Sequence, residues 1–524
     1  MNPRVKRWRV VLLLLACGVG SAFSAPRPFL MGTQPFFLTP TLSPFPDYVF
    51  ENLSDKDMIS MHIDDNLGIP WTNFENNTAL PSAWVSRISS LSASTSASGK
   101  VIYLSLTPLD GYRKTLAGTV DSSGSKTEGW APTDGTGCYP FATDANAAAY
   151  KTAYIRYAHY MIDNFHPAYV TLTIETNMEF AQCPAEKSAF IQWANDVTAD
   201  IKTNYPTLPT IPTFQVDFLY GFAAGSAYSC GTETTDSQRE ACFQQHIQEA
   251  LTVKGDRIGL SLYPVGWSYL RTGGFPLADT FNMIQSATSR PIWISETGWP
   301  QAALYNAYDH ASPPSSCGTV AIDSSVASEI YAESYLSNLL GEAQNRNFEG
   351  VVWFLNRDFM DASTASSCPC AGSNDTCSLA SELYAVGGTS IEVLFRSTAN
   401  EGLRNLDGTP HPVYAVWSSY LTQPYVSVTG TGTAATLDAI QIYPNPLRPA
   451  RGDLGINFNQ LPIGARVRIY TLAGEKVNDL TADTYNHAFW DGTNLDGRKA
   501  ASGVYFVLIE GGGDKKTLKV AIQR

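Results

Sequence analysis

The sequence predicts a (β/α)8 TIM barrel followed by a small C-terminal immunoglobulin-like β-sandwich. Three observations lead to this fold class. The chain has 524 residues, too many for one ordinary hydrophobic core. From about residue 28 to 421, short apolar runs alternate with longer segments of helical period, which is typical of repeated βα units. A linker-like stretch then precedes a short region that shows strand patterns alone.

Eight apolar runs rich in β-branched or aromatic residues are the predicted barrel strands. Helical stretches lie between them, such as Ala147 to Phe165, Lys187 to Asn204 and Ser325 to Gln344. Eight βα units over roughly 400 residues favour a barrel with long loops over an open doubly wound sheet. No glycine-rich phosphate loop follows the first strands, which weakens a nucleotide-binding alternative. The strands are expected near residues 28–33, 57–63, 100–106, 168–175, 211–218, 257–262, 290–296 and 349–355.

The segment Ser427 to Ala435 has Thr, Gly and Ala but no large apolar residue after Val428, and it predicts a flexible linker. We therefore assign residues 25–425 to the barrel, 426–436 to the linker and 437–524 to the sandwich. Strand-like alternation and turn residues support the sandwich. The strands are expected at Arg466 to Leu472 and Gly503 to Glu510, and the turns at Asn494 to Gly497 and Gly511 to Asp514.

The N-terminus has the layout of a secretory signal peptide, assigned to residues 1–24. Four basic residues precede the apolar run Val10 to Ala16, and small residues follow it. Leu-Leu-Ala-Cys at 14–17 leaves open a lipoprotein anchor on Cys17. No other segment reaches the roughly 18 apolar residues of a membrane-spanning helix. We expect a monomer that is secreted or attached to the cell surface.

Eight further cysteines, an even number in an exported chain, predict disulfides. Close spacing suggests a bond between Cys230 and Cys242. The pair Cys368-Pro-Cys370 resembles half a zinc site but lacks a second ligand pair of suitable spacing. We expect no metal and no organic cofactor. Cys317, Cys368, Cys370 and Cys377 are expected to pair among the long loops, and Cys138 and Cys183 complete the eight.

Charge is unevenly distributed along the chain. Between the signal and the tail, the formal charge is −19, whereas the whole chain carries −13. A body this acidic repels nucleic acid and anionic polymers. A neutral polysaccharide fits better as the substrate.

The segment Pro291 to Pro300, Pro-Ile-Trp-Ile-Ser-Glu-Thr-Gly-Trp-Pro, contains the first candidate catalytic residue. In a barrel, the C-terminal ends of the strands form the active-site mouth. With a period of two, Ile292, Ile294 and Glu296 share one face, which we take to point inward. A carboxylate at this position is better explained by chemistry than by packing, although a structural salt bridge is the alternative.

A second carboxylate, Glu175, ends the fourth predicted strand, where Tyr169, Thr171 and Thr173 precede it on the inward row. Glu179 is a rival that lies four residues later, and Glu175 is preferred because it alone continues that row. Two carboxylates facing one cavity are what hydrolysis of a glycosidic bond requires.

These strand-end residues resemble the retaining glycosidase clan whose acid/base follows strand four and whose nucleophile follows strand seven. The resemblance implies that Glu175 is the acid/base and Glu296 the nucleophile. Ile258-Gly-Leu-Ser-Leu-Tyr-Pro264 and Ser295-Glu-Thr-Gly-Trp-Pro300 are similar to the family 53 endo-β-1,4-galactanases, which implies a glycoside hydrolase acting on β-linked polysaccharide, with β-galactan as the implied substrate.

The chain departs from that clan at one position, because Ile174 stands where the clan usually has an Asn that binds the sugar 2-hydroxyl. Asn177 could serve from the neighbouring loop. The departure supports one alternative, a non-catalytic glycan-binding protein on a decayed barrel. A transglycosylase that uses the same residues is a further alternative, which the sequence does not separate from a hydrolase.

Further candidates lie near strand ends. His62 and Asp64 share a face of the second strand and could reach the mouth, or could form a rim salt-bridge cluster with Asp65. Asp217 could bind sugar or cap a helix. Aromatic faces commonly stack on sugar rings, although any one Trp could equally belong to the core. The remaining substrate-binding candidates are Tyr263, Trp267, Trp299, Trp353 and Asn356.

The tail has its own resemblance. Tyr443-Pro-Asn-Pro-Leu-Arg448, Val467 to Glu475, Trp490-Asp-Gly and Ala501 to Phe506 resemble flagellar hook-capping immunoglobulin-like domains and type IX secretion sorting domains. This implies that secretion machinery or the cell surface is its partner. A plain spacer is the alternative.

Overall fold

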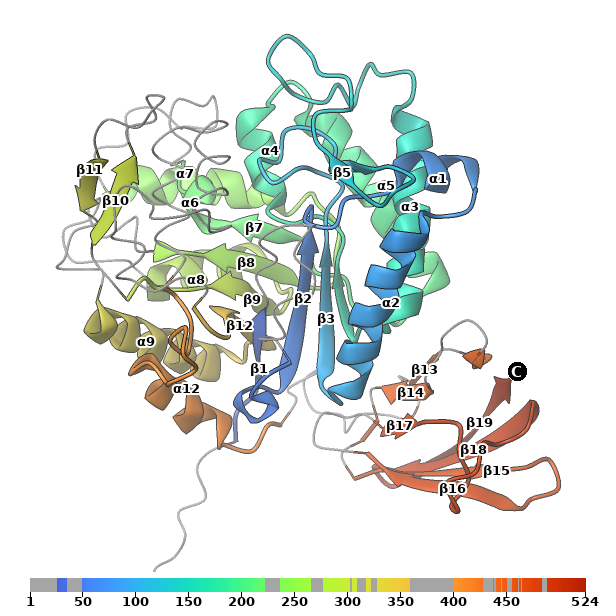
Figure 1. Ribbon diagram of the computed structural model, residues 1–524. Coiled ribbons are helices and arrows are strands. Elements are labelled where there is room, and N and C mark those ends of the chain that lie inside the picture. Colours follow the sequence, from blue (N-terminus) through green and yellow to red (C-terminus); the bar gives the residue numbers. More distant parts are fainter. Residues whose placement is uncertain are drawn as a thin grey trace, which may run out of the picture.

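A computed structural model of the chain places two folded regions and shows the strands of the first at the centre of a ring of helices (Figure 1). The signal peptide with Cys17, residues 427–436 of the linker and Trp267 lie outside the described residues. The described residues are 26–34, 50–221, 236–264, 277–301, 304–308, 317–321, 328–358, 400–426, 437, 440–443, 445–449, 455–459, 461–462, 464–482 and 488–524.

Eight parallel strands form the barrel. Their order is β6-β3-β2-β1-β12-β9-β8-β7, and every named pair is parallel. Backbone hydrogen bonds from Val170 N to Pro209 O (3.0 Å) and from Ile211 N to Val170 O (2.8 Å) join β6 to the segment directly before β7, so the barrel is nearly closed. The strands are β1 (Leu30–Gln34), β2 (Met58–Asp64), β3 (Val101–Leu106), β6 (Tyr169–Thr171), β7 (Thr213–Gln215), β8 (Ile258–Leu262), β9 (Ile292–Thr297) and β12 (Gly350–Leu355).

The predicted barrel is confirmed strand by strand, with two strands shorter than expected. β6 ends at Thr171 and β7 at Gln215, because the chain turns into a helix soon after each of them. The residues that follow these strands are therefore positioned by helix starts, and this affects the candidate site.

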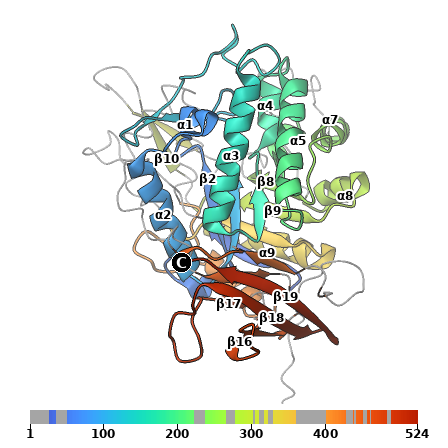
Figure 2. The same ribbon diagram turned by 90° about the vertical axis from the view of Figure 1, so that its right-hand side faces the viewer.

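Helices cover the outside of the barrel, with α2, α3 and α5 on one side (Figure 2). Two of them, α3 and α5, have the predicted bounds. Tyr154, Tyr157 and Met161 of α3 are buried in the core between the helices and the strands. Their spacing is the helical period expected from the sequence. The helices are α1 (Trp71–Asn76), α2 (Ser82–Ala97), α3 (Ala147–Phe165), α4 (Thr176–Gln182), α5 (Lys187–Asn204), α6 (Val216–Leu219), α7 (Asp236–Ala250), α8 (Leu277–Ala287), α9 (Glu329–Arg346) and α12 (Val413–Leu421), together with the 3-10 turn η2 (Leu53–Asp55).

Large side chains fill the inside of the barrel. Trp293 packs against Tyr103 and Tyr169, with ring centroids 5.3 and 4.5 Å apart. Gly350 on the neighbouring strand has to be glycine, because a Cβ there would lie 2.5 Å from the Trp293 ring. These aromatic rings fill the interior of the barrel as a packed core. The polar residues lie beyond them, at the C-terminal ends of the strands.

The tail has a separate hydrophobic core between two antiparallel sheets. One sheet has the order β13-β14-β17 and the other β16-β15-β18-β19. Both predicted turns are present, since Gly497 N donates to Asn494 O (2.9 Å) and Gly511 pairs with Asp514 across a tight hairpin. The immunoglobulin-like topology stays a prediction. The strands are β13 (Gln441–Tyr443), β14 (Ile456–Asn459), β15 (Arg466–Tyr470), β16 (Lys476–Thr481), β17 (Ala488–Trp490), β18 (Gly503–Gly511) and β19 (Asp514–Ile522).

Small hairpins decorate the barrel loops. They consist of β4 (Thr119–Val120) with β5 (Lys126–Thr127), and β10 (Leu304–Tyr308) with β11 (Cys317–Ala321).

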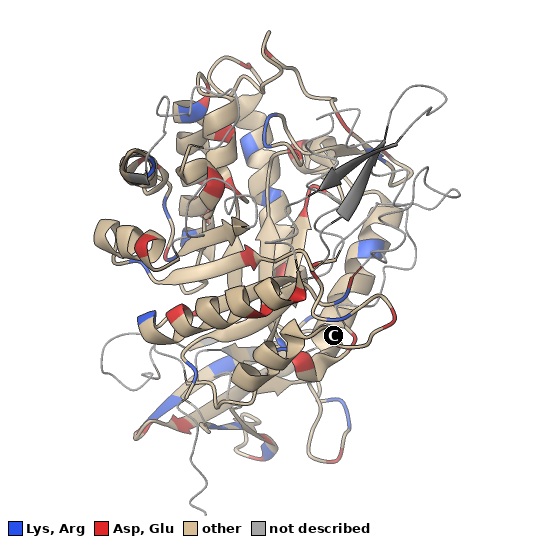
Figure 3. Ribbon diagram, turned by 90° about the vertical axis from the view of Figure 1, so that its left-hand side faces the viewer, with Lys and Arg blue, Asp and Glu red and all other residues tan. Residues whose placement is uncertain are grey.

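On the side drawn in Figure 3, acidic and basic segments are interspersed over the helices. In the described part of the chain, no helix is long and apolar enough to cross a membrane.

Disulfides are present, as the cysteine count predicts. Cys138 and Cys183 are bonded and join two segments separated by 45 residues. Cys242 on α7 is also disulfide-bonded. Cys230, Cys368, Cys370 and Cys377 lie outside the described residues, so the Cys230–Cys242 pair and the remaining pairings stay predictions.

The separate tail core generates a testable prediction. A chain of residues 25–426, which keeps Tyr425 in the barrel core and its pairing with Arg27, should fold and melt at a temperature close to that of the barrel in the full chain, because each core is complete within its own region. Differential scanning calorimetry of the full and shortened chains checks this. A fall of more than a few degrees in the barrel transition would contradict independence.

Candidate active site

Glu296 lies near the C-terminal end of β9, but it does not reach the mouth in the way that the sequence predicts. The expected inward row of Ile292, Ile294 and Glu296 is wrong, because both isoleucines belong to the outer core while Trp293 faces the barrel interior. Pairing with β8 shifts between Leu260↔Ile294 and Ser261↔Glu296. Pairing with β12 shifts over the same stretch. This irregularity at Ser295 is a bulge that changes the direction of the next side chain and aims Glu296 at the mouth.

Glu175 also reaches the mouth through a local irregularity of the backbone. It is the N-cap residue of α4, with φ 48° and ψ 45°, a left-handed conformation that is uncommon for a non-glycine residue. Its backbone N–H donates to Thr213 Oγ1 (2.8 Å) on β7, which holds the turn in place. The predicted continuous inward row of strand four is therefore replaced by a helix start that projects Glu175 toward Arg113.

Contacts link the two carboxylates through three intervening side chains. Arg113 Nη2 lies 3.3 Å from Glu175 Oε2. The same guanidinium binds both oxygens of Asp64, at 2.6 and 3.1 Å. His62 Nε2 lies 3.7 Å from Asp64 Oδ2, and His62 Nδ1 lies 3.9 Å from Glu296 Oε2. These side chains are 3–19% exposed, so the charges face a nearly dry mouth.

Tyr263, just after β8, extends this group on the far side of Glu296. Its hydroxyl donates a short hydrogen bond to Glu296 Oε1. Its ring packs edge-on against Phe354, with centroids 5.8 Å apart. We call Glu175, Arg113, Asp64, His62, Glu296 and Tyr263 the mouth network.

The electrostatics of the network distinguish its carboxylates. Burial raises the pKa of Glu175, Arg113 lowers it and Glu296 raises it, and the net pKa is about 7. Burial also acts to raise the pKa of Asp64, but Arg113 and His62 hold that pKa well below its usual range. Burial lowers the pKa of His62, yet Glu296 and Asp64 outweigh it and raise that pKa above 6.5. Near neutral pH, Glu175 is poised to exchange a proton while Asp64 stays ionised.

Arg113 was missed by sequence reasoning because it lies in the middle of a long loop rather than at a strand end. The only signal in the sequence was local: the Asp110-Gly-Tyr-Arg113 turn follows the third strand. Burial lowers the pKa of Arg113, but Asp64 and Glu175 more than offset that effect and raise it.

Two further acidic residues lie beside the network. Glu401 is 1% exposed, and neither of its carboxyl oxygens has a hydrogen-bond partner in the described structure. Burial raises its pKa well above the usual range, and the nearby charges of Glu296 and Asp358 raise it further. Gly298 makes room for this carboxyl, since a Cβ there would lie 2.1 Å from Glu401 Oε2. Burial also raises the pKa of Asp217 to about 7, although Gln215 Nε2 donates to it at 2.9 Å.

Several predicted substrate-binding residues lie away from the mouth network. Asn177 is buried in α4, and its amide exchanges hydrogen bonds with the backbone of Gln215 at 2.8 Å in both directions. Trp299 packs on Tyr335 in the core, with centroids 4.9 Å apart. Trp353 is fully buried and donates to Glu401 O (2.5 Å).

Asn356 accepts a hydrogen bond from Lys56 Nζ (2.9 Å) and is 2% exposed. Asp65 binds Lys126 (3.0 Å) and accepts from Gly118 N, which stabilises a neighbouring loop. Of the predicted substrate-binding residues, His62, Asp64 and Tyr263 join the two carboxylates.

Glu179, the rival of Glu175, points elsewhere. It lies one helical turn further along α4, and it is fully buried. The charges that act on it are those of Glu186 and Lys187, whereas those that act on Glu175 are in the mouth network. The described residues contain no cluster of three or more His, Cys, Asp or Glu suited to a metal ion.

Comparison with known proteins identifies the tail. Residues 441–523 match the family described as the secretion system C-terminal sorting domain. This confirms the predicted sorting-domain resemblance and indicates export by a secretion system. A search of curated proteins finds no match.

Solved structures give weaker likenesses. A surface component of the type-IX secretion system of Porphyromonas gingivalis is 32% identical over 18% of this chain and 13% of that chain, with a TM-score of 0.17. A GH5_18 protein from Bifidobacterium longum subsp. infantis is 14% identical over 78% and 81%, with a TM-score of 0.46. A β-glucuronidase from Bacteroides uniformis is 12% identical over 94% and 46%, with a TM-score of 0.37.

This chain thus spans 13% of the surface component and under half of the glucuronidase. At TM-scores below 0.5, these likenesses assign neither activity nor substrate.

The pKa of Glu175 predicts a pH-dependent cost to stability. Its folded value of about 7 exceeds the ordinary 4.5, so folding takes up a proton between these values and stability falls as the pH rises through them. Glu175→Gln removes this loss. Its stability relative to the native protein should therefore rise from pH 4.5 to pH 8 by up to roughly 3 kcal/mol.

Denaturant unfolding at both pH values measures this difference, with Glu75→Gln on α1 as the control. An equal difference at the two pH values would show that Glu175 titrates normally.

Proposed function

We propose that the barrel is a retaining glycoside hydrolase that cleaves β-glycosidic bonds in a neutral polysaccharide, with Glu175 as acid/base and Glu296 as nucleophile. One observation carries the proposal. Two carboxylates from opposite parts of the barrel enter one buried network, in which burial raises the pKa of Glu175 to about 7 and Tyr263 hydrogen-bonds Glu296. This asymmetry suits the two roles that the reaction requires.

In the first step, the Glu296 carboxylate attacks the anomeric carbon while Glu175 donates its proton to the departing oxygen. The glycosyl group is then bonded to Glu296 and the aglycone leaves as an alcohol. In the second step, Glu175 accepts a proton from water, whose oxygen attacks the anomeric carbon and releases Glu296. A pKa near 7 lets one group perform both proton transfers close to neutral pH.

The Tyr263 hydroxyl holds one oxygen of Glu296, and the other oxygen, which lies 3.9 Å from His62 Nδ1, is the one that attacks in this proposal. His62 lies on the other side of Glu296, and the charges of Glu296 and Asp64 raise the pKa of His62 although burial lowers it. β-Galactan remains the proposed substrate on the resemblance of the strand-six and strand-seven segments. A glycan-binding protein without catalysis and a transglycosylase are the other outcomes of the test.

For the tail, we propose export by the type IX system and attachment to the cell surface, supported by the sorting-domain match. Deleting residues 437–524 while keeping the signal peptide should abolish surface display in a host with that system. Fractionation and immunoblotting follow the protein. Unchanged surface display would favour the spacer alternative.

The carboxylate roles predict two different losses. Glu296→Gln should abolish formation of the glycosyl-enzyme. Glu175→Ala should slow cleavage of polysaccharide by roughly 10²–10⁴-fold, the usual range for lost acid/base catalysis. It should spare the first step on activated aryl glycosides, because a good leaving group needs no proton.

Azide should rescue Glu175→Ala and give a β-glycosyl azide, detected by NMR, since the anion enters from the face that Glu175 vacates. Glu179→Ala, in the same helix, is the matched control and should show no azide product. Rescue in that variant instead would transfer the acid/base role to Glu179. If a polysaccharide panel is bound but never cleaved, the binding alternative replaces the enzyme.

A further inference from the structure

Arg113 is held in an unusually well-fixed turn. The turn lies in the loop of residues 107–146, between β3 and α3. Arg113 has φ 59°, and its N–H donates to Asp110 O (2.9 Å). The Asp110 carboxylate accepts from the backbone N–H groups of Lys114 (2.8 Å) and Thr115 (3.2 Å). The backbone on both sides of Arg113 is thus fixed before its side chain reaches the mouth network.

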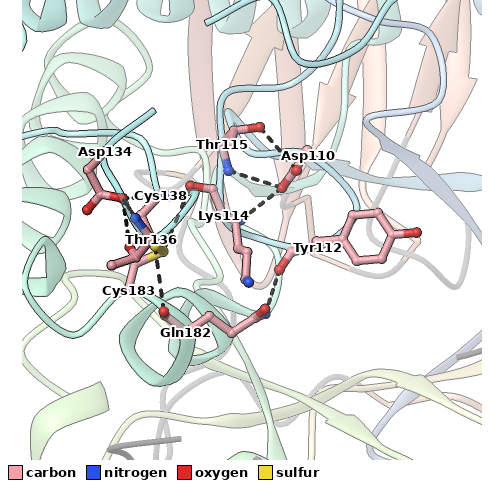
Figure 4. The surroundings of a disulfide bond; sticks show 9 residues. All are labelled: Asp110, Tyr112, Lys114, Thr115, Asp134, Thr136, Cys138, Gln182 and Cys183. Atoms are coloured by element: carbon pink, nitrogen blue, oxygen red, sulfur yellow. Dashed lines mark hydrogen bonds between the residues drawn. A yellow bond between two sulfur atoms is a disulfide. The ribbon is translucent and has the colours of Figure 1, made fainter. Parts of the chain in front are cut away.

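The same loop is fastened to the far end of α4. Cys183, the C-cap residue of that helix, is disulfide-bonded to Cys138 in the loop. The preceding residue, Gln182, donates from Nε2 to Tyr112 O (2.5 Å), directly before Arg113. Figure 4 shows these side chains converging between the helix end and the Asp110 turn.

α4 therefore meets the loop at both of its ends. Glu175 stands at its N-cap position and contacts Arg113, while Cys183 stands at its C-cap position and is bonded to Cys138. The helix has seven residues, about 10 Å of rise. Over so short a rigid element, a shift of the loop at one end changes the geometry at the other.

We propose that Arg113 is a positioning residue that sets the proton affinity of Glu175, and that the Cys138–Cys183 disulfide holds Arg113 in place to do so. The inference rests on the proposed function for its consequence in catalysis, but the contact itself does not depend on that function.

The charge balance gives the reason. Besides Arg113, the titratable groups that face Glu175 are Glu296 on β9, Asp64 and His62 on β2, Asp217 on α6 and Tyr263 after β8. Three of these, Glu296, Asp64 and Asp217, are carboxyl groups, and burial adds to the effect of their charges on Glu175. Without the guanidinium, Glu175 would keep its proton to higher pH and would be a poor base in the second step.

The geometry also explains why the loop needs an anchor. Arg113 binds Asp64 through two short contacts but reaches Glu175 through one contact of 3.3 Å. A small displacement of the loop can keep the first pair and lose the second. The disulfide and the Gln182–Tyr112 hydrogen bond oppose such a displacement.

The test measures the titration of Glu175 directly. Carboxyl carbons of ¹³C-labelled glutamate are followed by NMR in the full chain, and Glu175 is assigned by comparison with Glu175→Gln. Arg113→Gln should raise the pKa of Glu175 by at least about one unit. Arg113→Lys should restore part of the shift. The basic limb of kcat/KM should move to higher pH by the same amount.

The anchor is tested by the double variant Cys138→Ala/Cys183→Ala, which should raise the pKa of Glu175 in the same direction and by a smaller amount. Cys242→Ala is the matched control, since it removes a disulfide cysteine on α7, which holds none of the groups around Glu175. It should lower stability and leave the titration unchanged.

Each outcome has a separate meaning. An unchanged Glu175 titration in folded Arg113→Gln overturns the positioning role, and Arg113→Lys decides it if the Gln variant does not fold. A shift in Arg113→Gln without one in the double cysteine variant overturns the anchor. If Glu175→Gln does not change turnover, the proposed acid/base role fails, while the titration result still stands or falls by itself.

Discussion

Charge compensation in a nearly dry barrel mouth is the constraint on which the candidate site depends. Burying an ionised carboxylate without a partner costs several kcal/mol, and a buried pair is tolerated only when its geometry supplies charge and hydrogen bonds together. At the centre of the network, Arg113 supplies positive charge and hydrogen bonds to Asp64 and Glu175. Around Glu296, the partners are His62 and Tyr263. Removing any of these partners would leave a buried carboxylate without part of the charge or hydrogen bonds that stabilise it.

The backbone meets that constraint through local irregularities. Asp64, Arg113 and Glu175 all have positive φ, and the registers of β2 and β9 both shift close to Asp64 and Glu296. Left-handed residues and bulges commonly cost energy and persist where the surrounding structure fixes them. Here the left-handed residues and register shifts direct side chains from different elements toward one point. Regular strands would not bring these side chains together.

This explains how far the sequence could predict the molecule. The barrel followed from hydrophobic periodicity, and α3 and α5 even have the expected bounds, because long amphipathic segments encode their own burial. The positions of Glu175 and Glu296 were found by assuming regular alternation to the strand ends, yet alternation fails at both. Glu175 was located although β6 ends four residues earlier, and Glu296 although a bulge precedes it. Strand ends indicate the mouth even when the side-chain direction is set by other means.

The aromatic candidates show the opposite case. Trp299 and Trp353 stand at strand ends as Glu296 does, but large apolar rings gain most by burial, and both lie in the core. Sequence position alone does not separate a ring that faces a sugar from one that faces a helix. Arg113 shows why part of the site could not be found: its partners Asp64 and Glu175 are 49 and 62 residues away. Only the fold brings them together.

Glu401 completes the electrostatic argument. A second ionised carboxylate beside Glu296 would add repulsion that no cation among the described side chains offsets, since both Glu401 oxygens lack hydrogen-bond partners there. Burial and the charge of Glu296 raise its pKa well above the usual range, which favours the protonated carboxyl. The absence of a side chain at Gly298 leaves room for the Glu401 carboxyl, because a Cβ there would lie 2.1 Å from Glu401 Oε2. The carboxyl groups at the mouth thus differ in their pKa, which lies well below its usual range for Asp64, at about 7 for Glu175 and well above its usual range for Glu401. Their environments, rather than their chemical type, create the differences on which acid/base chemistry depends.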